Sequence, residues 1–126
     1  MASKGKIVFA EDNISISRVV IHKLSSDEYE VIHLPSGVGV LDAVIENKPD
    51  VVLLDIMMPV KDGLTVLKEI RETPDVAATP VIFLTATKDD ATVLKSLEYG
   101  ISDYIIKPFS ITTLSDRIQK VINKGK

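Results

Sequence analysis

The chain of 126 residues contains no cysteine. It can therefore form no disulfide bond, use no thiol nucleophile and offer no thiolate to a metal ion. This composition is compatible with a reducing cytosol. A domain of this length buries roughly two-thirds of the surface that its unfolded chain exposes. We therefore expect one hydrophobic core that is stable without disulfide bonds.

Long apolar runs are also missing. No stretch approaches the roughly 20 apolar residues of a membrane helix, and residues 1–6 lack the apolar segment of a secretory signal peptide. The formal net charge is −3, which gives no long-range attraction to the phosphates of nucleic acids. We therefore expect a soluble, cytoplasmic protein with no direct contact to membranes or nucleic acid.

Short apolar runs alternate with longer segments of helical periodicity. Five runs are predicted strands: Lys6–Ala10, Tyr29–Leu34, Val51–Leu54, Val81–Leu84 and Tyr104–Ile106. The strict alternation indicates an α/β fold with one parallel sheet between layers of helices. The length suits a single domain over residues 1–126.

The segments after these runs repeat apolar residues at helical spacing and are predicted helices. The last three are expected at Leu64–Glu72, Asp90–Tyr99 and Ile111–Asn123. Residues expected to face the core are Ile16, Val19, Val20, Leu24, Val40, Leu41, Val44, Ile45, Leu64, Leu67, Ile70, Ile111, Leu114, Ile118 and Ile122.

Turn and capping residues mark the boundaries of these helices. Asn13 or Ser15 is expected to cap the first helix. Asp62-Gly63 is expected to form a turn before the third, with Gly63 free to take a positive φ. Gly100 is expected to stop the fourth helix.

Chemically capable side chains follow four of the five predicted strands. Glu11 and Asp12 follow the first strand, Asp55 the third, Thr85 the fourth and Lys107 the fifth. In open α/β sheets, ligands bind beyond the carboxyl ends of the strands. Three carboxylates, a hydroxyl and an ammonium group should therefore converge on one edge of the sheet.

These residue types suit one reaction. Carboxylates held together repel one another unless a cation is present, and oxygen ligands without histidine or cysteine favour Mg²⁺. An ionised Asp55 is a competent nucleophile toward phosphorus and would form an acyl phosphate. Lys107 and the Thr85 hydroxyl could each bind a phosphoryl oxygen.

The whole chain resembles the receiver domain of bacterial response regulators, the phosphorylated switches of two-component systems. The matching segments are 11–12, 55–63, 85–86 and 107–109. The resemblance implies a doubly wound, flavodoxin-like sheet with strand order 2-1-3-4-5 and five helices. Glutamate at position 11, where aspartate is usual, is a departure that the family tolerates.

The resemblance also implies the role of each residue. Asp55 would be the phosphoacceptor; Mg²⁺ would be bound by Asp12 and Asp55 directly, by Glu11 through water and by the backbone carbonyl of Met57. Lys107 and Thr85 would contact the phosphoryl group, and Tyr104 would change rotamer when Thr85 moves. Met57 and Thr87 would flank the path of the attacking water and tune the lifetime of the acyl phosphate.

The resemblance implies two kinds of partner. A sensor histidine kinase or phosphotransfer protein would donate the phosphoryl group, and an output protein or domain would respond to the phosphorylated chain. The output surface would be formed by the fourth helix, the fifth strand and the fifth helix, with a phosphorylation-dependent homodimer as one outcome. Its expected contact residues are Lys95, Glu98, Asp103, Asp116 and Arg117. The chain would catalyse only its own phosphorylation and dephosphorylation.

Two other functions compete with this interpretation. A phosphorylation-independent binding module would not need to keep three mutually repelling carboxylates. A hydrolase with an aspartyl nucleophile usually adds a cap domain, for which 126 residues leave no room. The end of the chain soon after the last helix suits a stand-alone receiver and equally a piece of a longer regulator.

Overall fold

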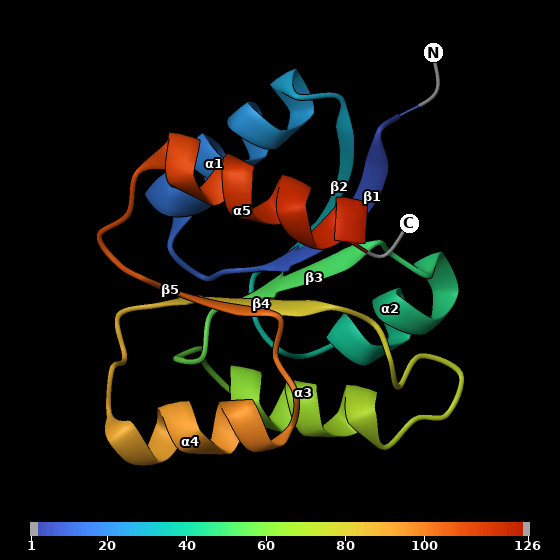
Figure 1. Ribbon diagram of the computed structural model, residues 1–126, viewed down its shortest axis with the longest axis vertical. Coiled ribbons are helices and arrows are strands. Elements are labelled where there is room, and N and C mark those ends of the chain that lie inside the picture. Colours follow the sequence, from blue (N-terminus) through green and yellow to red (C-terminus); the bar gives the residue numbers. More distant parts are fainter. Residues whose placement is uncertain (1–2, 125–126) are drawn as a thin grey trace.

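The computed structural model describes residues 3–124. Its strands form one parallel sheet in the order β2-β1-β3-β4-β5, which confirms the expected topology (Figure 1). The strands are β1 (Gly5–Ala10), β2 (Tyr29–Leu34), β3 (Val51–Leu54), β4 (Val81–Thr85) and β5 (Asp103–Ile106). The helices are α1 (Ile14–Ser26), α2 (Val40–Asn47), α3 (Gly63–Arg71), α4 (Asp90–Glu98) and α5 (Ile111–Lys124).

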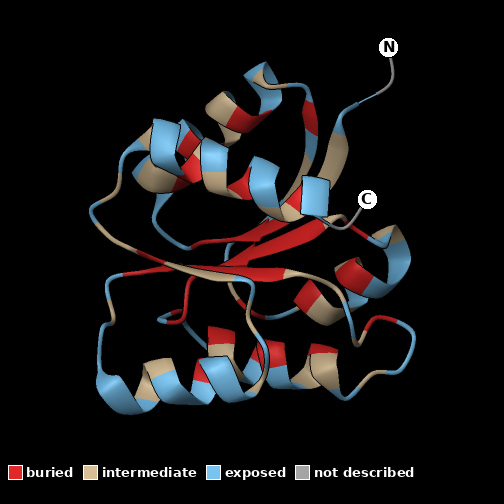
Figure 2. Ribbon diagram, in the orientation of Figure 1, coloured by how far each residue is buried: buried red, intermediate tan, exposed pale blue. Residues whose placement is uncertain are grey.

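Helices cover both faces of the sheet. In Figure 1, α1 and α5 lie on one side, and α2, α3 and α4 lie on the other. All residues of β3 and β4 are buried (Figure 2), as their continuous apolar sequences predict for central parallel strands. Alternate side chains of these strands enter two separate cores, one under α1 and α5 and one under α2 and α3.

Most of the predicted inward positions are buried or half-buried, but two are wrong. Val19 and Ile45 are exposed. In α1 the buried positions are Ser17, Val20 and Leu24, which recur at three and four residues. Val19 and Ile45 each adjoin a buried valine, and one residue along a helix turns the side chain by about 100°.

The helix caps confirm one prediction and correct another. Asn13 caps α1, and its side chain accepts a hydrogen bond from the Ile16 amide at 2.9 Å. Gly63 does not adopt a positive φ; it is the first residue of α3, and Asp62 is the N-cap. A Cβ at Gly63 would lie 2.4 Å from the Asp55 carbonyl oxygen. Glycine is therefore needed because α3 begins close against the end of β3.

The carboxyl ends of all five strands lie at one edge of the sheet, because the strands are parallel. Chain order reverses between β1 and β3, so the helices that follow these two strands, α1 and α3, lie on opposite faces of the sheet (Figure 1). Among residues 3–124, no helix combines the length and apolarity that crossing a membrane requires.

Candidate functional site

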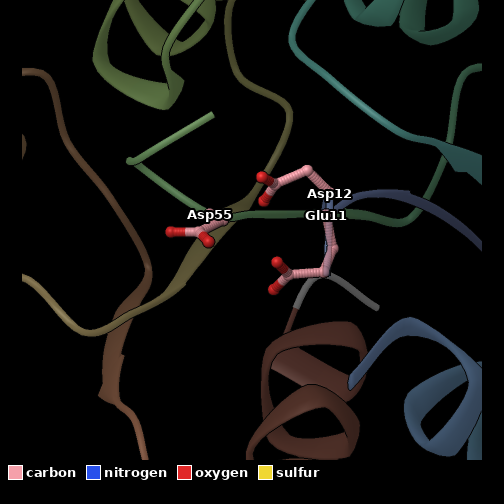
Figure 3. A group of neighbouring side chains, drawn as sticks. All are labelled: Glu11, Asp12 and Asp55. Atoms are coloured by element: carbon pink, nitrogen blue, oxygen red, sulfur yellow. The ribbon is translucent and has the colours of Figure 1, made fainter. Parts of the chain in front are cut away.

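The three predicted acidic residues meet at the carboxyl edge of β1 and β3. Ala10 and Leu54, the last residues of these strands, are paired, and the Asp55 amide donates to the Ala10 carbonyl at 3.1 Å. One carboxylate oxygen from each of Glu11, Asp12 and Asp55 lies within 4.8 Å of the others (Figure 3). Glu11 and Asp55 are only 1% and 5% exposed, whereas Asp12 faces solvent.

Lys107 joins this cluster from the end of β5. Its Nζ lies 2.7 Å from Glu11 Oε1 and 3.0 Å from Asp55 Oδ2. Burial lowers the pKa of Lys107, but hydrogen bonds and attraction to the two carboxylates outweigh it and leave the pKa raised. Burial also raises the pKa of Glu11, against the opposing effect of Lys107. The ammonium is therefore charged at neutral pH and shared between two buried acids.

One ammonium group cannot neutralise three carboxylates. Glu11, Asp12 and Asp55 offer only oxygen ligands, and their close spacing fits a small divalent cation such as Mg²⁺, which binds through one or two carboxylates and keeps several waters. Among residues 3–124, this is the only group of three or more acidic or histidine side chains with such spacing. The donor set thus meets the requirement for a hard cation at the predicted position.

Thr85 and Tyr104 lie on neighbouring strands beside the acidic cluster. Thr85 is fully buried at the end of β4, and its hydroxyl accepts a long hydrogen bond of 3.4 Å from the Thr87 amide. The Tyr104 hydroxyl donates to the Thr87 carbonyl, and its ring packs edge-on against Phe83 at 6.1 Å. Tyr104 therefore holds the loop between β4 and α4 in the arrangement described here.

Met57 lies on the loop that connects β3 to α3. Its amide donates to Asp55 Oδ1 at 3.1 Å, and the residue is 65% exposed. The same loop contains Val60, which is 92% exposed with a φ of 69°. A left-handed conformation costs a residue other than glycine about 1–2 kcal/mol. Sequence periodicity gave no signal for this strained position.

A salt bridge and a close backbone contact hold this loop in place. Lys61 Nζ lies 3.0 Å from both carboxylate oxygens of Glu69 in α3. A Cβ at Gly37 would lie 2.1 Å from the Lys61 carbonyl oxygen, so the segment between β2 and α2 can approach only because position 37 is glycine. The loop after Asp55 is therefore fixed from two sides.

The predicted output surface differs from expectation in two residues. Three of its five expected contact residues are exposed: Lys95, Glu98 and Asp116. Asp103 and Arg117 are instead half-buried, and they form an ion pair with each other at 3.0 Å. The prediction missed Leu94 and Leu97 of α4, which are 61% and 59% exposed. Their spacing of three residues puts both on one side of the helix, and that spacing is visible in the sequence.

Both histidines, His22 and His33, are exposed. His33 contacts the backbone at the edge of the site. Its Nε2 is 3.0 Å from the Glu11 carbonyl oxygen, and its ring packs beside Phe9. The contact supports the backbone that carries Glu11 and adds no ligand to the acidic cluster.

The bonds of Lys107 lead to a prediction about stability. Lys107→Met should lower the free energy of unfolding in EDTA by about 3 kcal/mol, since it leaves the buried Glu11 and Asp55 without their cation. Adding Glu11→Gln should recover part of this loss. Lys120→Met, at an exposed position of α5, is the control. Urea unfolding curves give the free energy of unfolding of the parent, the two single variants and the double variant. If Lys107→Met lowers this free energy no more than Lys120→Met does, the prediction is wrong.

Comparison with known proteins agrees with this geometry. The family model for the response regulator receiver domain matches residues 7–119. "Probable transcriptional regulator ycf27" of Guillardia theta is 40% identical over 98% of this chain and 48% of its own length. "Transcriptional regulatory protein CseB" of Streptomyces avermitilis is 36% identical over 98% of this chain and 52% of its own length. The chain thus spans about half the length of these relatives.

Solved structures are similar over nearly the whole chain. The receiver domain of the Francisella response regulator 1452 has a TM-score of 0.89 and 30% identity, over 98% of this chain and all of its own. The BeF3-activated N-terminal receiver domain of RstA from Klebsiella pneumoniae has a TM-score of 0.84 and 34% identity, over 93% of this chain and 97% of its own. The chain described here belongs to the response regulator receiver domain family of two-component signalling systems.

Proposed function

We propose that the domain is switched by transfer of a phosphoryl group to Asp55. The donor is a phosphohistidine of a sensor histidine kinase or phosphotransfer protein, and the domain works in the cytoplasm, where nucleotide-dependent kinases operate. One observation carries the proposal: the buried Asp55 carboxylate lies close to the carboxylates of Glu11 and Asp12 and 3.0 Å from the Lys107 ammonium. A purely structural aspartate would not need this set of neighbours.

The proposed reaction uses the ionised Asp55 as nucleophile. A carboxylate oxygen of Asp55 forms a bond to phosphorus while the phosphorus–nitrogen bond of the donor breaks, and the imidazole leaves with the electron pair. Lys107 and the Thr85 hydroxyl bind phosphoryl oxygens. Hydrolysis of the acyl phosphate by water later releases inorganic phosphate and restores Asp55. The domain acts only on itself, so it is a switch and not a turnover enzyme.

Asp12 and Asp55 would hold Mg²⁺ directly, Glu11 through water and Met57 through its backbone carbonyl. Bound there, the ion offsets the negative charge that develops during phosphoryl transfer. The chain's own contribution is to bring these oxygens together before the ion binds. Glu11 is already held by Lys107 and by the Asn13 amide at 3.2 Å.

Asp55→Asn should abolish stable phosphorylation by acetyl phosphate and Mg²⁺, while circular dichroism stays that of the parent. An amide at this position is not a competent nucleophile toward phosphorus. Asp42→Asn, at an exposed acid in α2, should be phosphorylated like the parent. Intact-protein mass spectrometry measures incorporation, and equal incorporation in Asp55→Asn would refute the assignment.

Mg²⁺ should raise the melting temperature of the parent, because it relieves repulsion among the three carboxylates. A ligand that binds only the native state adds about 2.7 kcal/mol at a hundredfold excess over Kd. Asp12→Ala should lose most of this gain, whereas Glu46→Ala, at an exposed acid in α2, should keep it. If Asp12→Ala gains as much from Mg²⁺ as the parent, the metal site is wrongly placed.

Met57 and Thr87 are proposed to set the lifetime of the acyl phosphate. Met57 is exposed and apolar, and its amide contacts Asp55. Its side chain should therefore hinder water more than a carboxamide would. Met57→Asn should therefore change the dephosphorylation rate several-fold and leave the affinity for Mg²⁺ within about twofold, since the carbonyl ligand remains. Phosphate release after removal of the donor gives the rate, and an unchanged rate would exclude this role.

The output surface is proposed to be α4, β5 and α5. Tyr104 links this surface to the site through the Thr87 carbonyl. A hollow of about 370 Å³ on the same side is lined by Tyr104, Phe109 and Arg117, among others. Exposed Leu94 and Leu97 beside Lys95 and Glu98 suit a protein partner or a second copy of the chain.

Couplings between two sites are typically about 1–3 kcal/mol, so phosphorylation should change the affinity for such a partner by roughly 5- to 150-fold. The relatives named transcriptional regulators are about twice as long as this chain. We propose that any contact with DNA in such a pathway is made by the output partner and not by this acidic domain.

A further inference from the structure

Arg71, the last residue of α3, connects three segments of the chain. Its Nη1 donates to the carbonyls of Ala77 at 3.0 Å and Thr79 at 2.8 Å, both in the segment that leads to β4. Its Nε donates to the Tyr99 carbonyl at 2.8 Å, and its Nη2 donates to the Gly100 carbonyl at 2.9 Å. Four of the five donors of the guanidinium are therefore used, all on backbone oxygens.

The Tyr99 and Gly100 carbonyls lie at the end of α4. The last carbonyls of a helix have no partner inside the helix, and positive charge near this end is favourable. Gly100 ends the helix with a φ of 80°. Within residues 3–124, no carboxylate lies within ion-pair distance of Arg71. Its positive charge is thus directed to the end of α4 and to the loop after α3.

The rest of α4 buries little surface against the domain. Ser96 is its only buried residue, and its hydroxyl bonds to the Thr92 carbonyl within the same helix. Most of the α4 ribbon is exposed in Figure 2. At the other end, Asp89 caps the helix with local bonds only, and the preceding loop is tied to the sheet by Tyr104 through the Thr87 carbonyl.

We propose that Arg71 is a positioning residue that pins the C-terminal end of α4. A change at Thr85 and Tyr104 then displaces the N-terminal end of α4 and tilts the helix about the pinned end. Without Arg71 the C-terminal end keeps only the packing of Tyr99 and Ile101 against the core and the hydrogen bond of the Ser102 amide to the Val81 carbonyl. The unphosphorylated domain then samples the displaced positions of α4 more often. The inference rests on the proposed output surface and adds the residue that makes the motion of α4 directional.

A purely local role for Arg71 would be to support the segment between α3 and β4. Val76 in that segment is buried, so Val76→Ala should loosen the segment without touching α4. Arg71→Gln loses the charge and most donors. Arg71→Lys keeps the charge on a single nitrogen that cannot form the planar set of four bonds. The hydrogen-exchange rate of α4 in Arg71→Lys should therefore lie between the rates in Arg71→Gln and in the parent.

Hydrogen exchange measured by mass spectrometry on the full chain, with Mg²⁺ and with or without beryllofluoride, provides the test. Without beryllofluoride, amides of residues 92–101 should exchange roughly tenfold faster in Arg71→Gln than in the parent. In Val76→Ala, acceleration should be confined to the segment that contains position 76. Phosphorylation of Arg71→Gln by acetyl phosphate should stay within about twofold of the parent, because Asp55 and its neighbours are unchanged.

Beryllofluoride should change exchange in the parent at the N-terminal turn of α4 and leave the C-terminal turn protected. In Arg71→Gln both turns should respond. Unchanged α4 exchange in Arg71→Gln, or acceleration equal to that in Val76→Ala, would overturn the role of Arg71. If Arg71→Gln unfolds, Arg71→Lys is compared with the parent by the same criterion. A parent that takes up no phosphoryl group refutes the proposed function, while the comparison without beryllofluoride still decides the role of Arg71.

Discussion

The bonds of Lys107 to Glu11 and Asp55 are the interaction on which the arrangement of the site depends. The carboxyl ends of parallel strands lie at one edge of the sheet. Three carboxylates lie together at this edge, and two of them are buried. Burial and mutual repulsion both oppose ionisation of such a group. Lys107 follows the last strand and Glu11 the first, so one ammonium joins residues near opposite ends of the chain and holds the Asp55 carboxylate in place.

The same sheet edge connects the site to the surface of the molecule. Thr85 is buried at the end of β4, the strand paired with β3, and the loop that follows Thr85 is held by Tyr104. Beyond that loop, α4 buries a single residue, whereas α3 on the same face buries four. A helix with so little buried surface can move at a small cost in free energy. In this account the hydrogen bonds of Arg71 decide which end of α4 moves.

The sequence predicted where the strands lie, because strand positions depend on local periodicity. It also predicted which side chains meet at the site, because parallel strands end at one edge of the sheet: Glu11, Asp12, Asp55, Thr85 and Lys107. The strand order came from resemblance to a family. Other features depend on contacts between distant segments and could not be predicted. A Cβ at Gly63 is excluded by the carbonyl oxygen of Asp55, the residue that follows β3, and Arg71 bonds to carbonyls up to 29 positions away. The ion pair of Asp103 with Arg117 likewise leaves two of the expected contact residues half-buried.

The central claim is that this edge of the sheet is a cation-assisted phosphoryl acceptor site. A crystal structure of the chain with Mn²⁺ in place of Mg²⁺ and with beryllofluoride tests it most directly, since the anomalous signal of Mn²⁺ locates the ion independently of any model. The account predicts one peak among Glu11, Asp12 and Asp55, beryllium bonded to an Asp55 carboxylate oxygen, and fluorine atoms in contact with Lys107 Nζ and the Thr85 hydroxyl. A Mn²⁺ peak elsewhere, or an Asp55 carboxylate without beryllium at saturating beryllofluoride, would contradict it.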